Sequence, residues 1–129
     1  VDSSREAVSE ADIIITATTS STPVILSEWL KPGAHINLIG PKFSDACELE
    51  PSIFQRASLL ATDSPDQALA FGDQLIVESL TDIPPLQDLA TLVASDYARP
   101  VRDRGISVFV SLGLAATEVI LANAILQKQ

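Results

Sequence analysis

Small and hydroxyl-bearing residues follow three apolar, β-branched stretches of this sequence, and they are the residues best suited to contact a ligand. Residues 12–17, 34–39 and 106–110 have the pattern of buried strands, and the polar segments at their ends are 16–20, 40–45 and 111–113. In an open parallel sheet, ligands bind in the crevice beyond the carboxyl ends of the strands. The three segments therefore predict one cleft, in which backbone groups and hydroxyls meet a flat polar ligand. The alternative interpretation is three core strands followed by ordinary polar turns.

Other kinds of catalytic centre find little support in the residue types. There is one histidine, one cysteine and no paired ligand spacing, so we expect no metal site, and the five glycines do not form a phosphate-binding motif. Composition permits a Ser–His–Asp arrangement, but no nucleophile elbow is present and His35 lies among apolar residues, which favours a packed strand residue. Cys47 has no evident basic neighbour, so we expect an inert thiol.

Composition narrows the class of protein. The 129 residues are 47% hydrophobic and 19% charged, which is typical of a globular chain long enough for one core. The formal net charge of −9 argues against nucleic-acid partners, which need a basic surface, and against an anionic membrane surface. A single cysteine rules out a disulfide within the chain and favours a reducing compartment, so we expect a cytoplasmic protein.

Two further features concern the ends of the chain. Residues 106–126 contain one charge and are long enough to cross a membrane, but a strand-like run, a break at residues 111–113 and a helix-like run favour a buried strand–turn–helix. The sequence contains no methionine and begins with Val1. We therefore expect that the chain is processed, trimmed or part of a longer protein.

Strand-like and helix-like stretches alternate along the sequence. We predict strands at 12–17, 34–39, 57–62 and 106–110, with helices at 1–10, 50–54, 64–71 and 86–94 and a largely buried helix at 114–126. Ser64, Pro65 and Gln67 form a helix start with a capping box. Residues 41–49 and 95–105 read as irregular or loop segments, and 74–80 are ambiguous. The alternation predicts an α/β fold with a parallel sheet and flanking helices.

The order and spacing of four segments resemble the ornithine cyclodeaminase/mu-crystallin family across nearly the whole chain. The four segments are A-D-I-I-I-T-A-T-T-S (11–20), E-W-L-K-P-G-A-H-I-N-L-I-G (28–40), C-E-L-E-P-S-I-F (47–54) and V-F-V-S-L-G-L-A (108–115). The resemblance implies a partial Rossmann-like sheet, the C-terminal portion of a dinucleotide-binding domain that uses NAD or NADP. It also implies hydride transfer at the α-carbon of a small amino or imino acid, and a homodimer built through a second domain.

The resemblance also implies roles for individual residues. Thr16, Ala17, Thr18 and Thr19 match the loop beside the adenosine half of the dinucleotide. The nicotinamide end is matched by two further segments, with Ile39, Gly40 and Pro41 beside its ribose and Ser111, Leu112 and Gly113 beside the nicotinamide itself.

One segment departs from the cyclodeaminase pattern. Where cyclodeaminases read like G-G-D-C-P-G-K-T-E-L, with a catalytic aspartate third, this chain reads G-P-K-F-S-D-A-C-E-L. Lys42 takes the place of that aspartate, and Asp45 aligns with an aspartate of the mu-crystallin-like branch. An ammonium group cannot act as a carboxylate base, so Lys42 and Asp45 are candidate catalytic residues for a reaction other than ornithine cyclodeamination. The alternative is that both are solvated loop residues.

Three functions remain open. The chain is part of an NAD(P)-dependent oxidoreductase or deaminating enzyme, or it is part of a mu-crystallin-like binding protein without significant turnover, or it is an inactive fragment of the family. The glycine-rich turn, the acidic residue that selects NAD and the substrate-binding Lys and Arg of the family have no match in these 129 residues. We therefore predict that the 129 residues alone bind NAD(P)H weakly or not at all.

Overall fold

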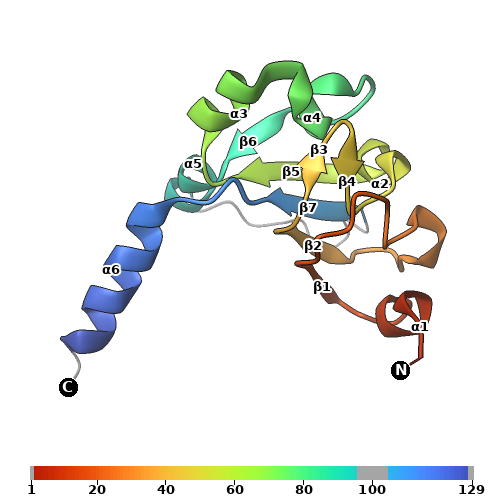
Figure 1. Ribbon diagram of the computed structural model, residues 1–129, viewed down its shortest axis with the longest axis horizontal. Helices are drawn as coiled ribbons and strands as arrows, with labels where there is room; N and C mark the ends of the chain where they lie inside the picture. The colour runs from red at the N-terminus through yellow and green to blue at the C-terminus, as the bar shows by residue number, and fades with distance from the viewer. Residues whose placement is uncertain (1, 96–104, 128–129) are drawn as a thin grey trace.

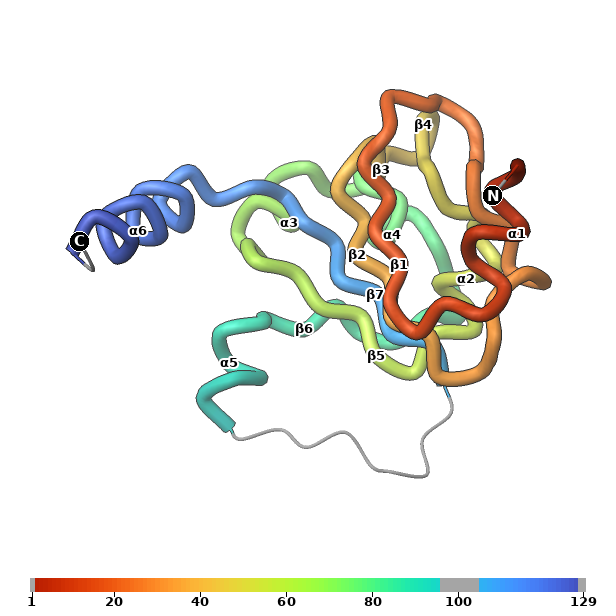
Figure 2. Tube along the Cα trace, turned by 90° about the horizontal axis from the view of Figure 1, so that it is seen from below, coloured from red at the N-terminus to blue at the C-terminus, as the bar shows by residue number. Residues whose placement is uncertain are grey.

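A five-stranded, wholly parallel sheet forms the centre of the molecule (Figure 1). The computed structural model describes residues 2–95 and 105–127. The strands follow the spatial order β1, β2, β7, β5, β6, with bounds β1 Ile13–Thr16, β2 His35–Leu38, β7 Ile106–Val110, β5 Ala57–Thr62 and β6 Leu86–Asp88. The last strand along the chain therefore lies between β2 and β5, as the view in Figure 2 also shows.

One face of the sheet carries the hydrophobic core. Alternate side chains of the strands point to this face and are buried, among them Ile14, Ile36, Leu38, Leu60 and Val108. Short helices cover this face of the sheet because packing against it removes their apolar side chains from water. They are η1 Ser27–Trp29, α2 Pro51–Gln55, α3 Pro65–Phe71, η2 Gly72–Gln74 and α4 Ile76–Ser79. Figure 1 shows α2, α3 and α4 together on one side of the sheet.

Among residues 2–95 and 105–127, only a few cover the opposite face. Ile13 and Ile15 of β1 are 66% and 68% exposed, although their neighbours Ile14 and Thr16 are buried. The short helix α5 Leu89–Ala94 is the element beside this face at the β5–β6 side. Parallel sheets are normally covered on both faces, so the exposed isoleucines mark a surface that is unusual for this architecture.

The structure confirms the four predicted strands and adds a fifth. Residues 86–94, which the periodicity predicts as one helix, are divided into β6 and α5 at Asp88. The Asp88 side chain accepts hydrogen bonds from the Ala90 and Thr91 N–H groups and so caps α5 at its first residue. The predicted helix is therefore correct for residues 89–94 only. Residues 86–88 pair with β5 and form a strand instead.

Residues 41–49 are also more regular than predicted. A small antiparallel hairpin, β3 Lys42–Phe43 and β4 Ala46–Cys47, stands on the core side of the sheet. In α3 the predicted start at Ser64 is right, but the Ser64 side chain makes no capping bond. Gln67, the expected partner in the capping box, instead donates to the Gly113 carbonyl at 3.4 Å.

The terminal helices differ in their contacts with the rest of the molecule. α1 Ser4–Val8 buries Val8 in the core, whereas α6 Ala115–Leu126 projects away from the sheet in both views (Figures 1 and 2). The expectation that residues 114–126 are largely buried is therefore wrong for this structure: Val119, Ile120 and Leu121 are 61–69% exposed. Within the described residues, no helix combines the length and apolar character needed to cross a bilayer.

Candidate functional site

The carboxyl ends of four strands lie level with one another at one edge of the sheet. Thr16 pairs with Leu38, Leu38 with Val110, and Val110 with Thr62. The chain therefore leaves the sheet at residues 17, 39, 111 and 63 along a single line. The first residues of the three segments predicted to contact a ligand are brought together here, and a fourth segment, which begins at Asp63, joins them.

The first segment, residues 16–20, begins with a buried residue and continues with exposed ones at 17–19. Thr16 is 4% exposed on the core side, and within the described residues its Oγ1 is buried without a hydrogen-bond partner. Ala17, Thr18 and Thr19 are exposed, and the Thr18 hydroxyl accepts a bond of 3.0 Å from the Ser20 N–H group, which shapes the turn. The surface available to a ligand is therefore formed by residues 17–19 rather than by the Thr16 side chain.

The second segment continues β2 along the first. The Ile39 and Gly40 N–H groups both donate to the Thr16 carbonyl, at 2.9 and 3.2 Å. Ile39 is 44% exposed, while Gly40 and Pro41 are half-buried behind it. An exposed aliphatic side chain beside a backbone turn offers a flat apolar contact for a ring or a sugar.

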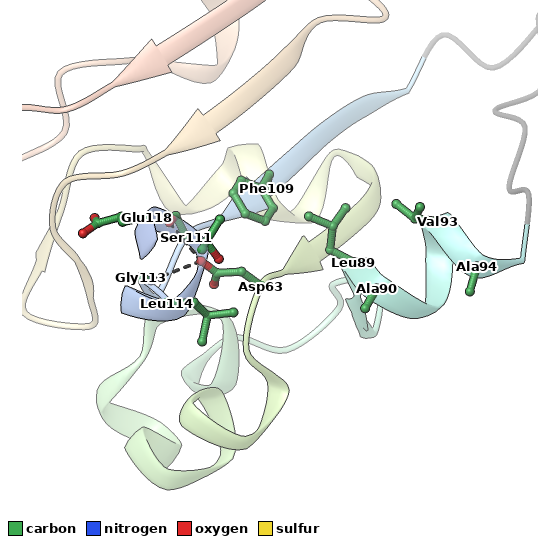
Figure 3. Close-up of a pocket in the computed structure, with 11 residues that line it drawn as sticks. Asp63, Leu89, Ala90, Val93, Ala94, Phe109, Ser111, Gly113, Leu114 and Glu118 are labelled. Carbon is green, nitrogen blue, oxygen red and sulfur yellow. Dashed lines mark hydrogen bonds between the residues drawn. The ribbon is translucent and has the colours of Figure 1, made fainter. Parts of the chain in front are cut away.

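Asp63 holds the third segment in place. Its carboxylate accepts hydrogen bonds from the Leu112 and Gly113 N–H groups at 2.7 and 3.1 Å and from the Ser111 hydroxyl at 3.2 Å. Figure 3 shows the Asp63 side chain, just beyond the end of β5, directed at Ser111 and Gly113, just beyond the end of β7. Gly113 has a φ of 81°, a left-handed conformation that glycine adopts without strain.

A cleft opens beside this turn on the less covered face of the sheet. Its volume is about 700 Å³, within the range of small-molecule sites. Asp63, Phe109 and Ser111 line one wall and the apolar side of α5 lines the other, with Leu89 and Val93 facing in (Figure 3). The walls are mainly apolar, with a few polar groups gathered at the strand ends.

The two candidate catalytic residues lie at opposite ends of the β3–β4 hairpin. Lys42 is at its base, half-buried, and its Nζ donates to the Ile39 carbonyl at 2.9 Å. Burial lowers the pKa of Lys42, against the opposing effect of Asp63 and Glu48, which raise it. Asp45 is exposed in the turn, where it lines a separate hollow with Phe71 and so is not grouped with the strand ends.

The histidine and the cysteine have structural surroundings. The His35 Nδ1 lies 2.9 Å from the Ser107 hydroxyl on the neighbouring strand, as befits a packed strand residue. Cys47 is 7% exposed, and burial raises the pKa of its thiol. Among the described residues, no group of three or more His, Cys, Asp or Glu side chains is arranged to hold a metal ion.

Glu48 is one of two functional candidates that sequence reasoning missed. It follows β4, has no exposed surface, and its carboxylate accepts hydrogen bonds from the Thr18 N–H group and, at 3.0 Å, from the Gly40 N–H group. A signal was available, because a glutamate between the apolar residues Cys47 and Leu49 must find hydrogen-bond partners if it is buried. Asp63 was missed as well, although it directly follows the predicted strand at residues 57–62.

Comparison with known proteins decides the family. The family model described as "Ornithine cyclodeaminase/mu-crystallin family" matches residues 1–129. The chain belongs to this family. The resemblance drawn from the four sequence segments is therefore confirmed, and the α/β fold with a parallel sheet is that of the family's solved structures.

Relatives with named activities match most of the chain. Ketimine reductase mu-crystallin of Mus musculus is 37% identical over 122 residues, and a delta(1)-pyrroline-2-carboxylate reductase of Bacillus cereus is 35% identical over 128. The matches cover 94% and 96% of this chain but 37% and 39% of the relatives. The chain thus spans well under half the length of these family members.

A solved structure supports the same assignment. The Thermococcus litoralis delta(1)-pyrroline-2-carboxylate reductase, solved with NADH and L-proline, is 32% identical and superposes with a TM-score of 0.76 over 95% of this chain and 39% of its own. Family membership is thereby established on sequence and on fold. The contacts with cofactor and substrate expected of individual residues here stay predictions.

Proposed function

We propose that the protein containing this chain is an NAD(P)-dependent reductase of small cyclic or linear imino acids, and that this chain supplies the C-terminal part of its dinucleotide-binding domain. The observation that carries the proposal is the common edge at which residues 17–19, 39–41 and 111–113 leave the sheet. Relatives named for ketimine and pyrroline-carboxylate reduction support the substrate class.

The strand-end residues suit the less charged parts of a nicotinamide dinucleotide. The Thr18, Gly40, Leu112 and Gly113 N–H groups already donate to the carboxylates of Glu48 and Asp63. These N–H groups are unavailable to a phosphate, and two carboxylates behind them repel one. Hydroxyls, carbonyls and the Ile39 side chain remain for ribose and the aromatic rings, so the pyrophosphate must bind elsewhere in the protein.

The chemistry at this edge follows from what the residues can offer. The bound dinucleotide supplies the hydride that reduces an imine carbon. Ser111 and the turn that Asp63 holds would orient the nicotinamide end, and the apolar wall formed by Leu89, Val93 and Phe109 would exclude water from the cleft. Lys42, whose pKa is lowered by burial, can hold or release a proton closer to neutral pH than an exposed lysine can.

The exposed apolar surfaces support the idea that this chain works within a larger assembly. Ile13 and Ile15 on one sheet face, and Val119, Ile120 and Leu121 on α6, together present apolar area that a parallel α/β domain normally buries. We propose that other parts of the protein, including a substrate-binding and dimerising domain, cover these surfaces. A homodimer and a cytoplasmic location belong to this proposal.

A mu-crystallin-like binding protein is the second candidate. Lys42, at the position where cyclodeaminases carry their catalytic aspartate, favours either this function or a reductase over cyclodeamination. Such a protein would bind the dinucleotide without significant turnover. A chain of the family with no activity of its own is the third candidate.

Cofactor oxidation by the full-length protein separates these functions. NADH and NADPH are each mixed with pyrroline-2-carboxylate, its six-membered homologue and linear imino acids, and the absorbance of the reduced nicotinamide is followed. Substrate-dependent loss of absorbance supports the reductase, and the faster coenzyme identifies NAD or NADP. Saturable binding without oxidation supports the binding protein, and neither binding nor oxidation supports an inactive member.

A further inference from the structure

We propose that Glu48 is a positioning residue that sets the spacing between the two loops expected to bracket the dinucleotide, at residues 17–19 and 39–41. This inference rests on the proposed function, because it assigns a role in dinucleotide binding. It goes beyond that function by naming a buried carboxylate which need not touch the ligand.

The backbone of Glu48 is held on both sides. Its N–H group donates to the Pro41 carbonyl at 3.1 Å, and its own carbonyl accepts from the Val24 and Ile25 N–H groups at 2.7 and 3.2 Å. The residue therefore has little freedom to move with respect to the chain that follows β1 and the chain that follows β2. A side chain projecting from such a fixed point can position whatever it binds.

The carboxylate spans the two loops. Oε1 accepts the Thr18 N–H group and Oε2 accepts the Gly40 N–H group, so one side chain joins the ends of β1 and β2. The Gly40 N–H group is shared with the Thr16 carbonyl, whereas Glu48 is the partner of the Thr18 N–H group. Hydrogen bonds to a charged acceptor are stronger than neutral ones, and Glu48 is fully buried, which limits competition from water.

The space around Glu48 is shaped for this contact. A Cβ atom at residue 40 would collide with the Glu48 carboxyl group, so the absence of a side chain at Gly40 is what lets the carboxylate reach the backbone. Only a carboxylate offers two acceptors with this reach. Glutamine has the same size but one acceptor and one donor, and therefore turns an NH₂ group toward one of the two N–H groups.

The test compares two variants of the full-length protein that make the same chemical change. Glu48→Gln alters the loop-spanning carboxylate. Glu50→Gln alters a second glutamate that accepts a backbone N–H bond, from Ser27 at 2.8 Å, away from the strand ends. Dissociation constants for NADH and NADPH are measured by fluorescence titration well below the unfolding temperature of each variant, so that only folded protein is compared.

The expected result is a rise of about tenfold in the dissociation constant of the preferred dinucleotide for Glu48→Gln, the equivalent of one charged hydrogen bond, with Glu50→Gln unchanged. A dissociation constant equal to that of the wild type in folded Glu48→Gln would overturn the inference. So would an equal rise in both variants, because that would indicate general loosening of the fold. If the wild type itself binds neither dinucleotide, the proposed function fails and the positioning role fails with it.

A second variant keeps the inference testable if Glu48→Gln does not fold. Gly40→Ala retains the carboxylate but displaces it through the new Cβ atom. The inference then requires weaker dinucleotide binding by Gly40→Ala, and wild-type binding by this variant would contradict it.

Discussion

The Glu48 carboxyl group occupies the space at the end of β2 that a Cβ atom at residue 40 would fill, so this position has room only for glycine. The glutamate carboxylate then lies against the glycine backbone and accepts its N–H group at 3.0 Å. Two residues eight positions apart are thus mutually constrained, which makes them suitable for a double-mutant test.

Shortening the glutamate should relieve the effect of an alanine at residue 40. Gly40→Ala alone should lower the free energy of unfolding by about 1–3 kcal/mol because the new Cβ atom overpacks the site. Glu48→Asp withdraws the carboxylate by one methylene, so the alanine should be tolerated better in that background. Urea unfolding of the four proteins gives the coupling energy. Strictly additive effects would contradict the packing relationship.

Asp63 should contribute measurably to stability through the turn after β7. Asp63→Asn keeps the size of the side chain but replaces one carboxylate oxygen by an NH₂ group. This group cannot accept a hydrogen bond, although two backbone N–H groups and a hydroxyl donate to Asp63 in the wild type. We expect a loss of about 1–3 kcal/mol in the free energy of unfolding. The exposed Asp73 provides the control, since Asp73→Asn should change stability by less than about 0.5 kcal/mol. Equal effects of the two changes would argue against the role of Asp63.

Cys47 should resist alkylation in the native protein. Its thiol is 7% exposed and burial raises its pKa, so both access and thiolate content are low at neutral pH. Peptide mapping after brief treatment with iodoacetamide should find Cys47 largely unmodified, and the same treatment in guanidinium chloride should modify it fully. Rapid native modification would show that the β3–β4 hairpin opens readily.

Lys42 should make stability rise with pH in the alkaline range. Its pKa in the folded protein is below the ordinary value of 10.5, mainly because burial disfavours the charged form. Between the lowered pKa and 10.5 the unfolded chain binds more protons than the folded one, so the unfolding free energy increases as pH rises through this window. Lys42→Met should remove that increase. A pH profile unchanged by the substitution would contradict the assignment.

The 129 residues alone should bind NADH and NADPH weakly or not at all. The N–H groups at the strand ends are bound to Glu48 and Asp63, and a phosphate-binding glycine turn is absent from this sequence. Fluorescence titration of this segment tests the expectation, and saturation at micromolar coenzyme would overturn it.

Local patterns were sufficient to predict most of the fold. β-Branched runs located four strands, and residues 57–62 were predicted with the bounds that β5 has in the structure. The strand β6 was missed because a three-residue edge strand has too little pattern of its own and is defined by pairing with β5. The prediction that residues 114–126 are buried was wrong. An apolar helix sequence indicates that the helix packs against something, but it does not indicate which part of the protein it packs against.

The parts of the candidate site that lie at strand ends could be predicted from the sequence. The parts that depend on contacts between residues far apart in the sequence could not. The segments 16–20, 40–45 and 111–113 follow from strand positions alone, whereas the placing of residues 39–41 beside a ribose came from the family resemblance and stays a prediction. The roles of Glu48 and Asp63 depend on N–H groups 8 to 50 residues away, and no local pattern encodes such distances. The separation of Lys42 and Asp45 likewise arises from the hairpin, which orients two near neighbours to different surroundings.

The central position of β7 has a consequence for how the protein is made. β1 pairs with β2, and β5 pairs with β6, but the two pairs meet only through β7, which follows the other four strands of the sheet in the sequence. Until residues 106–110 have been synthesised, β2 and β5 each lack the strand that pairs with their inner edge, and an unpaired strand edge is vulnerable to association with other chains. Joining of the two strand pairs is therefore a late, long-range event in the synthesis of this segment.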